Sequence, residues 1–220
     1  MRKTPLINDE FYHIYNRGVE QRNIFLEEND LNRFLESIRF FNTENPVGSL
    51  RDKKELLHQR SDRWEEKAQK RLVDVACYCL NPNHHHLLLR QRQERGVSEF
   101  IKRLSGGYTR FFNDKYNRNG VLFQGKFKSI HVNSNEYLLH LSVYINLNNR
   151  LGGLGDTIMA LSRSSWGEYI GQDMGGFCEK GIILNQFSNI REYEKFALDS
   201  FKDMVSRKEK DEEFRRLLLE

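Results

Sequence analysis

The sequence predicts an α+β fold built on a ferredoxin-like antiparallel sheet, with elements in the order β-α-β-β-α-β and helices on one face. Three observations predict it: four segments are typical of strands, two carry apolar residues at helical spacing, and turn signals separate them. The second face of such a sheet is left for a ligand or a partner. A further helix and a helical C-terminal tail are expected to follow the last strand.

The first half of the chain supplies three strands and one helix. Residues 11–17 alternate aromatic and polar side chains, which predicts a strand. Asp30 is expected to cap a helix, because one apolar stripe follows it: Leu31, Phe34, Leu35, Ile38 and Phe41. Residues 49–70 are highly charged, so we interpret them as an inserted loop or an exposed helix. Residues 72–80 and 84–90 then form a strand hairpin around Asn81-Pro82-Asn83.

The second half begins with a helix over residues 97–116, which Gly106-Gly107 weakens in its middle. Residues 121–124 and 127–132 are expected to form a strand broken by Gly125. Asn133-x-x-Glu136 resembles a capping box and predicts a helix from there through Asn148. A glycine-rich segment, 152–155, closes this unit. The tail contains SSWGEYIG (Ser164–Gly171) and a charged helix from about Asn189.

Composition excludes several classes of protein. No stretch approaches the ~18 consecutive apolar residues of a membrane span, and the N-terminal residues lack the apolar core of a secretory signal. Three cysteines do not make a disulfide framework and suit a reducing compartment. Mean hydropathy is −0.72, while 12% aromatic residues are enough for a core. We therefore expect a cytoplasmic protein without membrane contact.

Charge is concentrated in one part of the chain. The net charge is only +4, but residues 90–131 contain ten Lys and Arg against three acidic residues, a local charge of +7. Seven Phe and Tyr lie between these charges, a pattern that suits phosphate contacts and base stacking. The alternative is a solvated helix face over an aromatic core. The candidate DNA-binding side chains are Arg92, Lys102, Arg103, Arg110, Lys115, Arg118, Lys126 and Lys128.

His84 and His86 lie two residues apart on a predicted strand, which places both imidazoles on one face. Such a pair offers two ligands to a metal ion, although two histidines alone hold a metal poorly. The structural alternative is that they are packed side chains. His85 points to the opposite face, where a core position is expected.

Tyr144 and Asn148 lie one turn apart on the helix predicted after Asn133. A phenol and an amide at this spacing can present a nucleophile and a metal ligand to the same point. The alternative is that Tyr144 is a half-buried ring and that Asn148 is a helix C-cap. Leu138 and Ile145 lie on the adjoining face of this helix, available to pack on the sheet.

Several motifs resemble those of one family. CLNPNHHHLLL (residues 79–89) resembles the Met-Pro-Asn-His-x-His-Leu-Leu pattern of the HUH single-tyrosine transposases, and in particular of the REP-associated tyrosine transposases. GVLFQGKFKS (120–129) resembles the following strand, and EYLLHLSVYINLNN (136–149) resembles the catalytic helix. FYHIYNRGV and SSWGEY also resemble family segments. The resemblance covers roughly residues 10–170, with all motifs in order.

The resemblance implies an HUH transposase-like catalytic domain at 1–155, with 49–70 as a charged insertion. A C-terminal extension at 156–220 would be family-like to about 171. Tyr144 would be the nucleophile, and His84, His86 and Asn148 would hold a divalent ion, Mg²⁺ or Mn²⁺. Single-stranded DNA beside a hairpin would be cleaved and rejoined through a 5′-phosphotyrosine. The enzyme would act as monomer or homodimer, with the tyrosine serving its own histidine pair or its partner's.

The sequence also departs from the family pattern. Asn81 stands where Met or another apolar residue is usual, His85 where an apolar residue is common, Asn146 where His is common and Asn149 where Pro is usual. These departures leave open an altered or lost activity. The alternatives are a non-catalytic, domesticated protein that binds single-stranded nucleic acid, a metal hydrolase unrelated to DNA, and an ordinary α+β domain.

Overall fold

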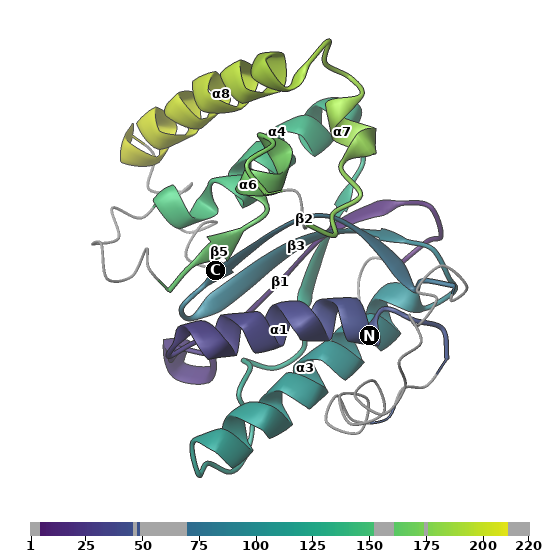
Figure 1. Cartoon of the computed structure of the whole chain (residues 1–220), viewed down its shortest axis with the longest axis vertical. Helices are drawn as coiled ribbons and strands as arrows, with labels where there is room; N and C mark the ends of the chain where they lie inside the picture. Colours follow the sequence, from purple (N-terminus) through teal and green to yellow (C-terminus); the bar gives the residue numbers. More distant parts are fainter. Residues whose placement is uncertain (1–4, 46–47, 49–69, 152–160, 174–175, 211–220) are drawn as a thin grey trace.

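A computed structural model describes residues 5–45, 48, 70–151, 161–173 and 176–210 (Figure 1). The main elements are β1 (Phe11–Arg17), α1 (Glu28–Phe41), β2 (Val73–Asn81), β3 (His84–Gln91), α3 (Gly96–Lys115), β4 (Lys128–Val132) and α4 (Asn135–Asn146). After them come η3 (Asn148–Arg150), β5 (Arg163–Ser164), α6 (Trp166–Tyr169), α7 (Gly181–Leu184) and α8 (Ile190–Lys210); a short turn η1 (Val19–Gln21) follows β1. The predicted β-α-β-β-α-β order and the additional helices are therefore confirmed.

The sheet has the strand order β4-β1-β3-β2-β5. All four strand pairs are antiparallel, as predicted for a ferredoxin-like sheet. β1 lies between β3 and β4, so Tyr15 pairs with His86 on one side and with Lys128 on the other. β5 pairs with the outer edge of β2 and brings residues after position 155 into the sheet.

Alternation along β3 divides the core into two layers. His85, Leu87 and Leu89 are fully buried on the face covered by α1 and α3, together with Tyr12 and Ile14 of β1 (Figure 1). His84, His86 and Leu88 point to the other face, since successive side chains of a strand alternate. The central strands are therefore apolar on both faces, as expected for a sheet with helices on each side.

The second face of the sheet is not left open. α4 packs across it, and α8 lies beyond α4 (Figure 1). The contact with the sheet uses Leu138, Leu141 and Ile145 of α4, against Cys77 and Cys79 of β2 among others. The part of this face next to His84 and His86 remains accessible through a cavity described below.

The helix boundaries differ from prediction at their caps. Glu27, and not Asp30, is the N-cap of α1; Asp30 completes the capping box from the third helical position. Ser134, and not Asn133, caps α4, since its hydroxyl accepts the Tyr137 N–H at 3.1 Å. α4 ends at Asn146, and a separate 3-10 turn begins at Asn148. In both cases a polar residue of the right type lies within three positions of the cap, which is why the sequence signal was ambiguous.

Two further predictions have different outcomes. Residues 121–124 are not a strand; an isolated bridge between Gly18 and Phe123 and a hydrogen bond from the Gln124 N–H to the Arg17 carbonyl join them to the end of β1. The charged segment 49–69 and the glycine-rich segment 152–155 lie outside the described residues. In the portion of the chain that is described, no helix has the length and apolar character to cross a membrane.

Candidate functional site

The two histidines lie at the start of β3, where the tight β2–β3 hairpin places them. Asn81 pairs with His84 across the turn, and Cys79 pairs with His86. The two imidazole rings face the same side of the sheet, with centroids 5.1 Å apart and planes at 87°. His84 is half-buried and His86 is buried. The prediction that the two share a face is confirmed, and His85 is a core residue on the other face.

Hydrogen bonds decide which nitrogen of each imidazole is available. Nδ1 of His84 lies 2.6 Å from Oδ1 of Asn83, which can only accept, so Nδ1 carries the proton and Nε2 keeps a lone pair. Nδ1 of His86 lies 2.9 Å from Nε2 of His13, which leaves Nε2 of His86 for the cavity. A metal-binding histidine needs this arrangement, with one nitrogen held by a protein partner and the other unprotonated.

Burial keeps these imidazoles neutral. It lowers the pKa of His13 to about 3 and lowers the pKa of His86 well below its ordinary value; charge repulsion from neighbouring histidines adds to the effect at His86. Burial also lowers the pKa of His84, although a hydrogen bond to Asn148 acts in the opposite direction. The pair is therefore in the unprotonated form that metal binding requires.

Helix α4 brings Tyr144 against this pair. The Tyr144 ring lies edge-on to His86, with centroids 5.6 Å apart, and edge-on to His13 at 6.1 Å. Burial raises the pKa of the Tyr144 phenol, and a hydrogen bond to Asn148 partly opposes this rise. The phenol is therefore protonated at neutral pH and needs activation to act as a nucleophile.

Asn148 lies between the histidine pair of β3 and Tyr144 of α4. Its side chain opposes both the lowering of the His84 pKa and the raising of the Tyr144 pKa that burial causes. Oδ1 of Asn148 also accepts a hydrogen bond of 2.6 Å from Nδ2 of Asn81, whose same Nδ2 lies 2.9 Å from Nε2 of His84. The structure thus brings together all four residues predicted for the site: Tyr144, His84, His86 and Asn148. Asn148 is not the cap of α4, because that position is taken by Leu147.

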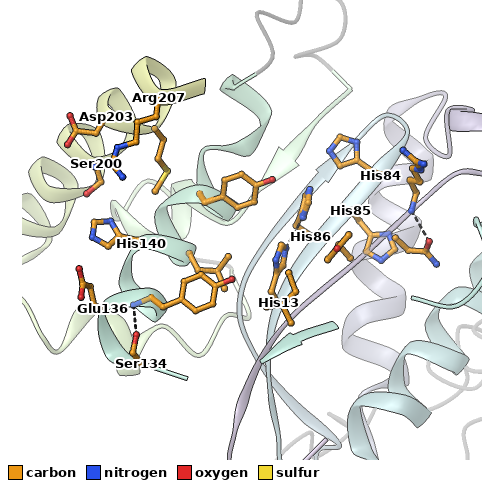
Figure 2. A pocket seen from close by; sticks show the side chains of 18 of the residues that line it. His13, His84, His85, His86, Ser134, Glu136, His140, Ser200, Asp203 and Arg207 are labelled. Carbon is orange, nitrogen blue, oxygen red and sulfur yellow. Dashed lines mark hydrogen bonds between the residues drawn. The ribbon is translucent and has the colours of Figure 1, made fainter. Parts of the chain in front are cut away.

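A cavity of about 770 Å³ opens in front of these residues. One wall is formed by the sheet, through His13, His84 and His86, and the facing wall by α4 and α8, with His140, Glu136, Asp203 and Arg207 (Figure 2). Tyr15, Tyr137 and Tyr144 add three aromatic rings to the lining. Its volume and its mixture of rings and polar groups suit a nucleotide-sized ligand.

The donor set fits a divalent ion. Within the described part of the chain, no group of three His, Cys, Asp or Glu side chains is placed to hold a metal. The amide oxygen of Asn148 is a ligand of another kind, and it lies 2.6 Å from the Asn81 Nδ2 atom that also contacts Nε2 of His84. Two imidazoles, one amide oxygen and open positions suit Mn²⁺ or Mg²⁺ with bound water or phosphate oxygen.

The predicted DNA-binding side chains are divided between the two faces of the sheet. Lys128 lies on the cavity side: it pairs with Tyr15, and its Nζ lies 5.8 Å from the centre of the Tyr15 ring. α3, which covers the opposite face, carries Lys102, Arg103, Arg110 and Lys115. Arg92 follows β3 and pairs with Asp9, and the segment between α3 and β4 holds Arg118 and Lys126.

Lys115 and Arg103, like Arg92, have partners within the fold. Lys115 contacts the fully buried carboxylate of Asp30 at 2.5 Å and Glu27 at 2.6 Å. Arg103 contacts Glu99 at 2.9 Å and the Thr43 carbonyl at 2.7 Å. Both interactions hold α3 to neighbouring segments. The basic and aromatic stretch is thus in part the packed helix that the sequence left open as an alternative.

Two comparisons with known proteins found similar proteins. A family model described as "Transposase IS200 like" matches residues 50–148. The match shows a similarity to IS200-like transposases over less than half of the 220-residue chain. The matched part contains the hairpin, β4 and α4, and with them His84, His86, Tyr144 and Asn148.

One solved structure similar to this chain is described as a REP-associated tyrosine transposase bound to a REP hairpin. The alignment covers 80% of this chain and 88% of that chain, at 11% sequence identity and a TM-score of 0.45. No curated protein sequence matches the chain.

Sequence reasoning missed one residue of the site. His13 of β1 holds His86 and lines the cavity, yet it was considered only as part of a predicted strand. A signal was available: alternation places Phe11, His13 and Tyr15 on one face of β1, and a ferredoxin-like order puts the first strand beside the third. The two facts together place His13 next to the histidine pair.

Proposed function

We propose that this protein cleaves and rejoins single-stranded DNA through a covalent bond to Tyr144, with a divalent ion held by His84, His86 and Asn148. The observation that carries the proposal is the convergence of these groups: Nδ2 of Asn81 lies 2.9 Å from Nε2 of His84 and 2.6 Å from Oδ1 of Asn148, and the Tyr144 ring lies edge-on to His86 with centroids 5.6 Å apart. A phenol and a set of metal ligands that lie this close together can act on the same phosphate group.

The reaction requires one bond to form and one to break. The Tyr144 oxygen attacks the phosphorus of a backbone phosphodiester, and the bond from phosphorus to the 3′ oxygen breaks. The products are a 5′-phosphotyrosine and a free 3′-hydroxyl, and the phenol proton is lost as the 3′ oxygen gains one. Since the phosphodiester energy is kept in the covalent link, attack by another 3′-hydroxyl rejoins the strand.

The residues of the chain position and activate the groups. A bound divalent ion would supply charge for the non-bridging phosphate oxygens. The side-chain oxygen of Asn83 accepts from Nδ1 of His84, which leaves Nε2 of His84 unprotonated, and His13 occupies Nδ1 of His86, so that Nε2 of His86 faces the cavity. Burial disfavours the Tyr144 phenolate in the absence of substrate, and the hydrogen bond to Asn148 partly compensates. The resting site therefore keeps its nucleophile protonated until positive charge is added.

The cavity supports a single strand as substrate. Its walls bring Tyr15 and Tyr137 close to the histidines, and aromatic rings stack on unpaired bases. Lys128 beside Tyr15 adds a cation for the backbone. A hairpin next to the cleavage site is an expectation that follows from the sequence resemblance.

The decisive experiment is incubation of the full chain with labelled single-stranded hairpins and Mn²⁺, scored for an adduct that survives denaturation. Tyr144→Phe is expected to abolish the adduct while hairpin binding persists, because only the hydroxyl is lost. Tyr137→Phe, about two turns earlier on the same face of α4 and in the same cavity, is the matched control and should keep the adduct. An adduct that persists in Tyr144→Phe and disappears in Tyr137→Phe would move the nucleophile to Tyr137.

Metal dependence is tested in the same assay. EDTA, His84→Ala and His86→Ala are each expected to remove the adduct. Cleavage that Mn²⁺ still stimulates in either alanine variant contradicts the proposed metal site. Hairpin binding without an adduct under any divalent ion would instead identify a non-catalytic protein that binds single-stranded nucleic acid.

A further inference from the structure

Asn81 is the last residue of β2 and lies at the centre of the site. Its side chain is 1% exposed. The Nδ2 atom lies 2.9 Å from Nε2 of His84 and 2.6 Å from Oδ1 of Asn148. One buried amide nitrogen is therefore in contact with two atoms to which the proposed function assigns metal binding.

Both contacts use lone pairs that a cation would use. Nδ1 of His84 is protonated because it faces Oδ1 of the Asn83 side chain, which can only accept. Nε2 of His84 is therefore an acceptor. Oδ1 of Asn148 can only accept. The two hydrogens of the Asn81 Nδ2 atom satisfy both acceptors, and they place partial positive charge where the two lone pairs converge.

The spacing also matches a coordination shell. Neighbouring ligands of an octahedral Mg²⁺, each about 2.1 Å from the ion, lie about 3.0 Å apart. The polar atom of Asn81 is 2.9 Å from the His84 ligand atom and 2.6 Å from the Asn148 ligand atom. An oxygen at the same position would therefore be spaced as a third ligand adjacent to both.

We infer that Asn81 is a further member of the metal centre, and this inference rests on the proposed function. Without the ion, its Nδ2 atom holds His84 and Asn148 together. When the ion binds, the amide turns by half a rotation about its Cβ–Cγ bond and presents Oδ1 as a ligand. Cys79 makes both orientations acceptable, because its thiol lies 3.8 Å from the present Oδ1 and can also accept weakly from Nδ2.

The test measures binding of Mn²⁺ to the full chain without DNA, by titration calorimetry. Asn81→Leu removes both polar atoms at similar size, and it is expected to weaken Mn²⁺ binding at least tenfold. Asn81→Asp supplies an oxygen ligand and is expected to bind Mn²⁺ at least as tightly as wild type. Asn113→Leu, a matched change on α3, should leave binding unchanged, since Asn113 contacts the Gly120 carbonyl instead.

The outcomes separate this inference from the proposed function. Wild-type binding that Asn81→Leu leaves unchanged or tightens overturns the inference alone, because the amide then only competes with the ion. If Asn81→Leu does not fold, as judged by its melting curve in EDTA, Asn81→Asp decides: binding tenfold weaker than wild type overturns the inference. Absence of Mn²⁺ binding in wild type, or binding that His84→Ala leaves intact, overturns the proposed function as well.

A second readout follows the amide itself. The side-chain amide signals of Asn81 in a ¹H–¹⁵N spectrum are identified by their absence in Asn81→Asp. Titration with Mg²⁺ is expected to shift these signals in wild type and not in His84→Ala. Signals that stay in place while the protein binds Mg²⁺ would show that Asn81 takes no part.

Discussion

His13 of β1 and His86 of β3 are joined by a buried hydrogen bond, with 2.9 Å between Nε2 of the first and Nδ1 of the second. The two rings are stacked, with centroids 5.1 Å apart. Because this bond occupies Nδ1 of His86, it determines which nitrogen of His86 faces the cavity. His13 is thus a positioning residue for the proposed metal ligand.

Replacement of His13 by Ala is expected to weaken Mn²⁺ binding by about 10- to 100-fold, the usual effect of losing a partner that orients a ligand. His13→Gln, which keeps an acceptor, should recover part of the loss. Calorimetric titration with Mn²⁺ measures both. His131→Ala is the control, since that imidazole lies on β4 and contacts Glu10, outside the site. Full Mn²⁺ affinity in His13→Ala would show that His86 needs no partner.

His85 is expected to limit the stability of the fold in acid. It is 0% exposed, and within the described residues neither ring nitrogen has a hydrogen-bond partner. Burial lowers its pKa to about 3 in the folded protein, against about 6.5 in the unfolded chain. The unfolded state therefore binds the proton first as pH falls below 6.5, and this residue destabilises the fold by about 1.4 kcal/mol for each further pH unit.

His85→Leu should consequently raise the free energy of unfolding at pH 5 by more than it does at pH 7.5. Urea unfolding at the two pH values measures the difference, with wild type as the reference. An equal effect at both pH values would mean that His85 is already protonated in the fold or accessible to water.

Lys115 is expected to stabilise the fold by pairing with Asp30. The Asp30 side chain is 0% exposed and the Lys115 side chain 23%, so removal of the cation leaves a buried carboxylate without its ion pair. Lys115→Met should lower the free energy of unfolding by about 3 kcal/mol. Lys102→Met, at a side chain that is 79% exposed on the same helix, should change it by less than about 0.5 kcal/mol. Similar unfolding curves for the two variants would contradict a structural role of Lys115.

Lys128 is expected to contact DNA at the cavity, because it lies on the same face of the sheet as Tyr15. Lys128→Ala should weaken binding of a single-stranded oligonucleotide and lower the slope of log affinity against log salt by about 0.7. Lys102→Ala on α3 is the comparison, since α3 covers the opposite face. Fluorescence anisotropy at several salt concentrations measures both. A larger effect of Lys102→Ala would place the strand along α3.

Local patterns predicted the strands and the shared face of His84 and His86, because the period of two residues is fixed by the backbone of a strand. They also predicted the burial of Leu138 and Ile145 on α4. The end of α4 was missed, since the chain turns at Leu147, which is fully buried by contacts distant in sequence. Asn148 consequently reaches the site from a separate turn, although one continuous helix was expected.

The role of His13 and the central place of Asn81 could not be read from local patterns. Each depends on which strand lies beside which and on the register between them. The division of the basic residues has the same origin. α3 and β4 are close in sequence, but α3 covers one face of the sheet and β4 is a strand at its edge. Charge counted along the chain does not distinguish these positions.

α4 folds back onto the sheet of its own chain, and this has a kinetic consequence. Tyr144, both histidines and Asn148 then belong to one polypeptide, so the specific rate of strand cleavage should not depend on enzyme concentration. A mixture of Tyr144→Phe and His84→Ala proteins should then stay inactive, and activity regained in the mixture would show that the tyrosine of one chain serves the histidine pair of another.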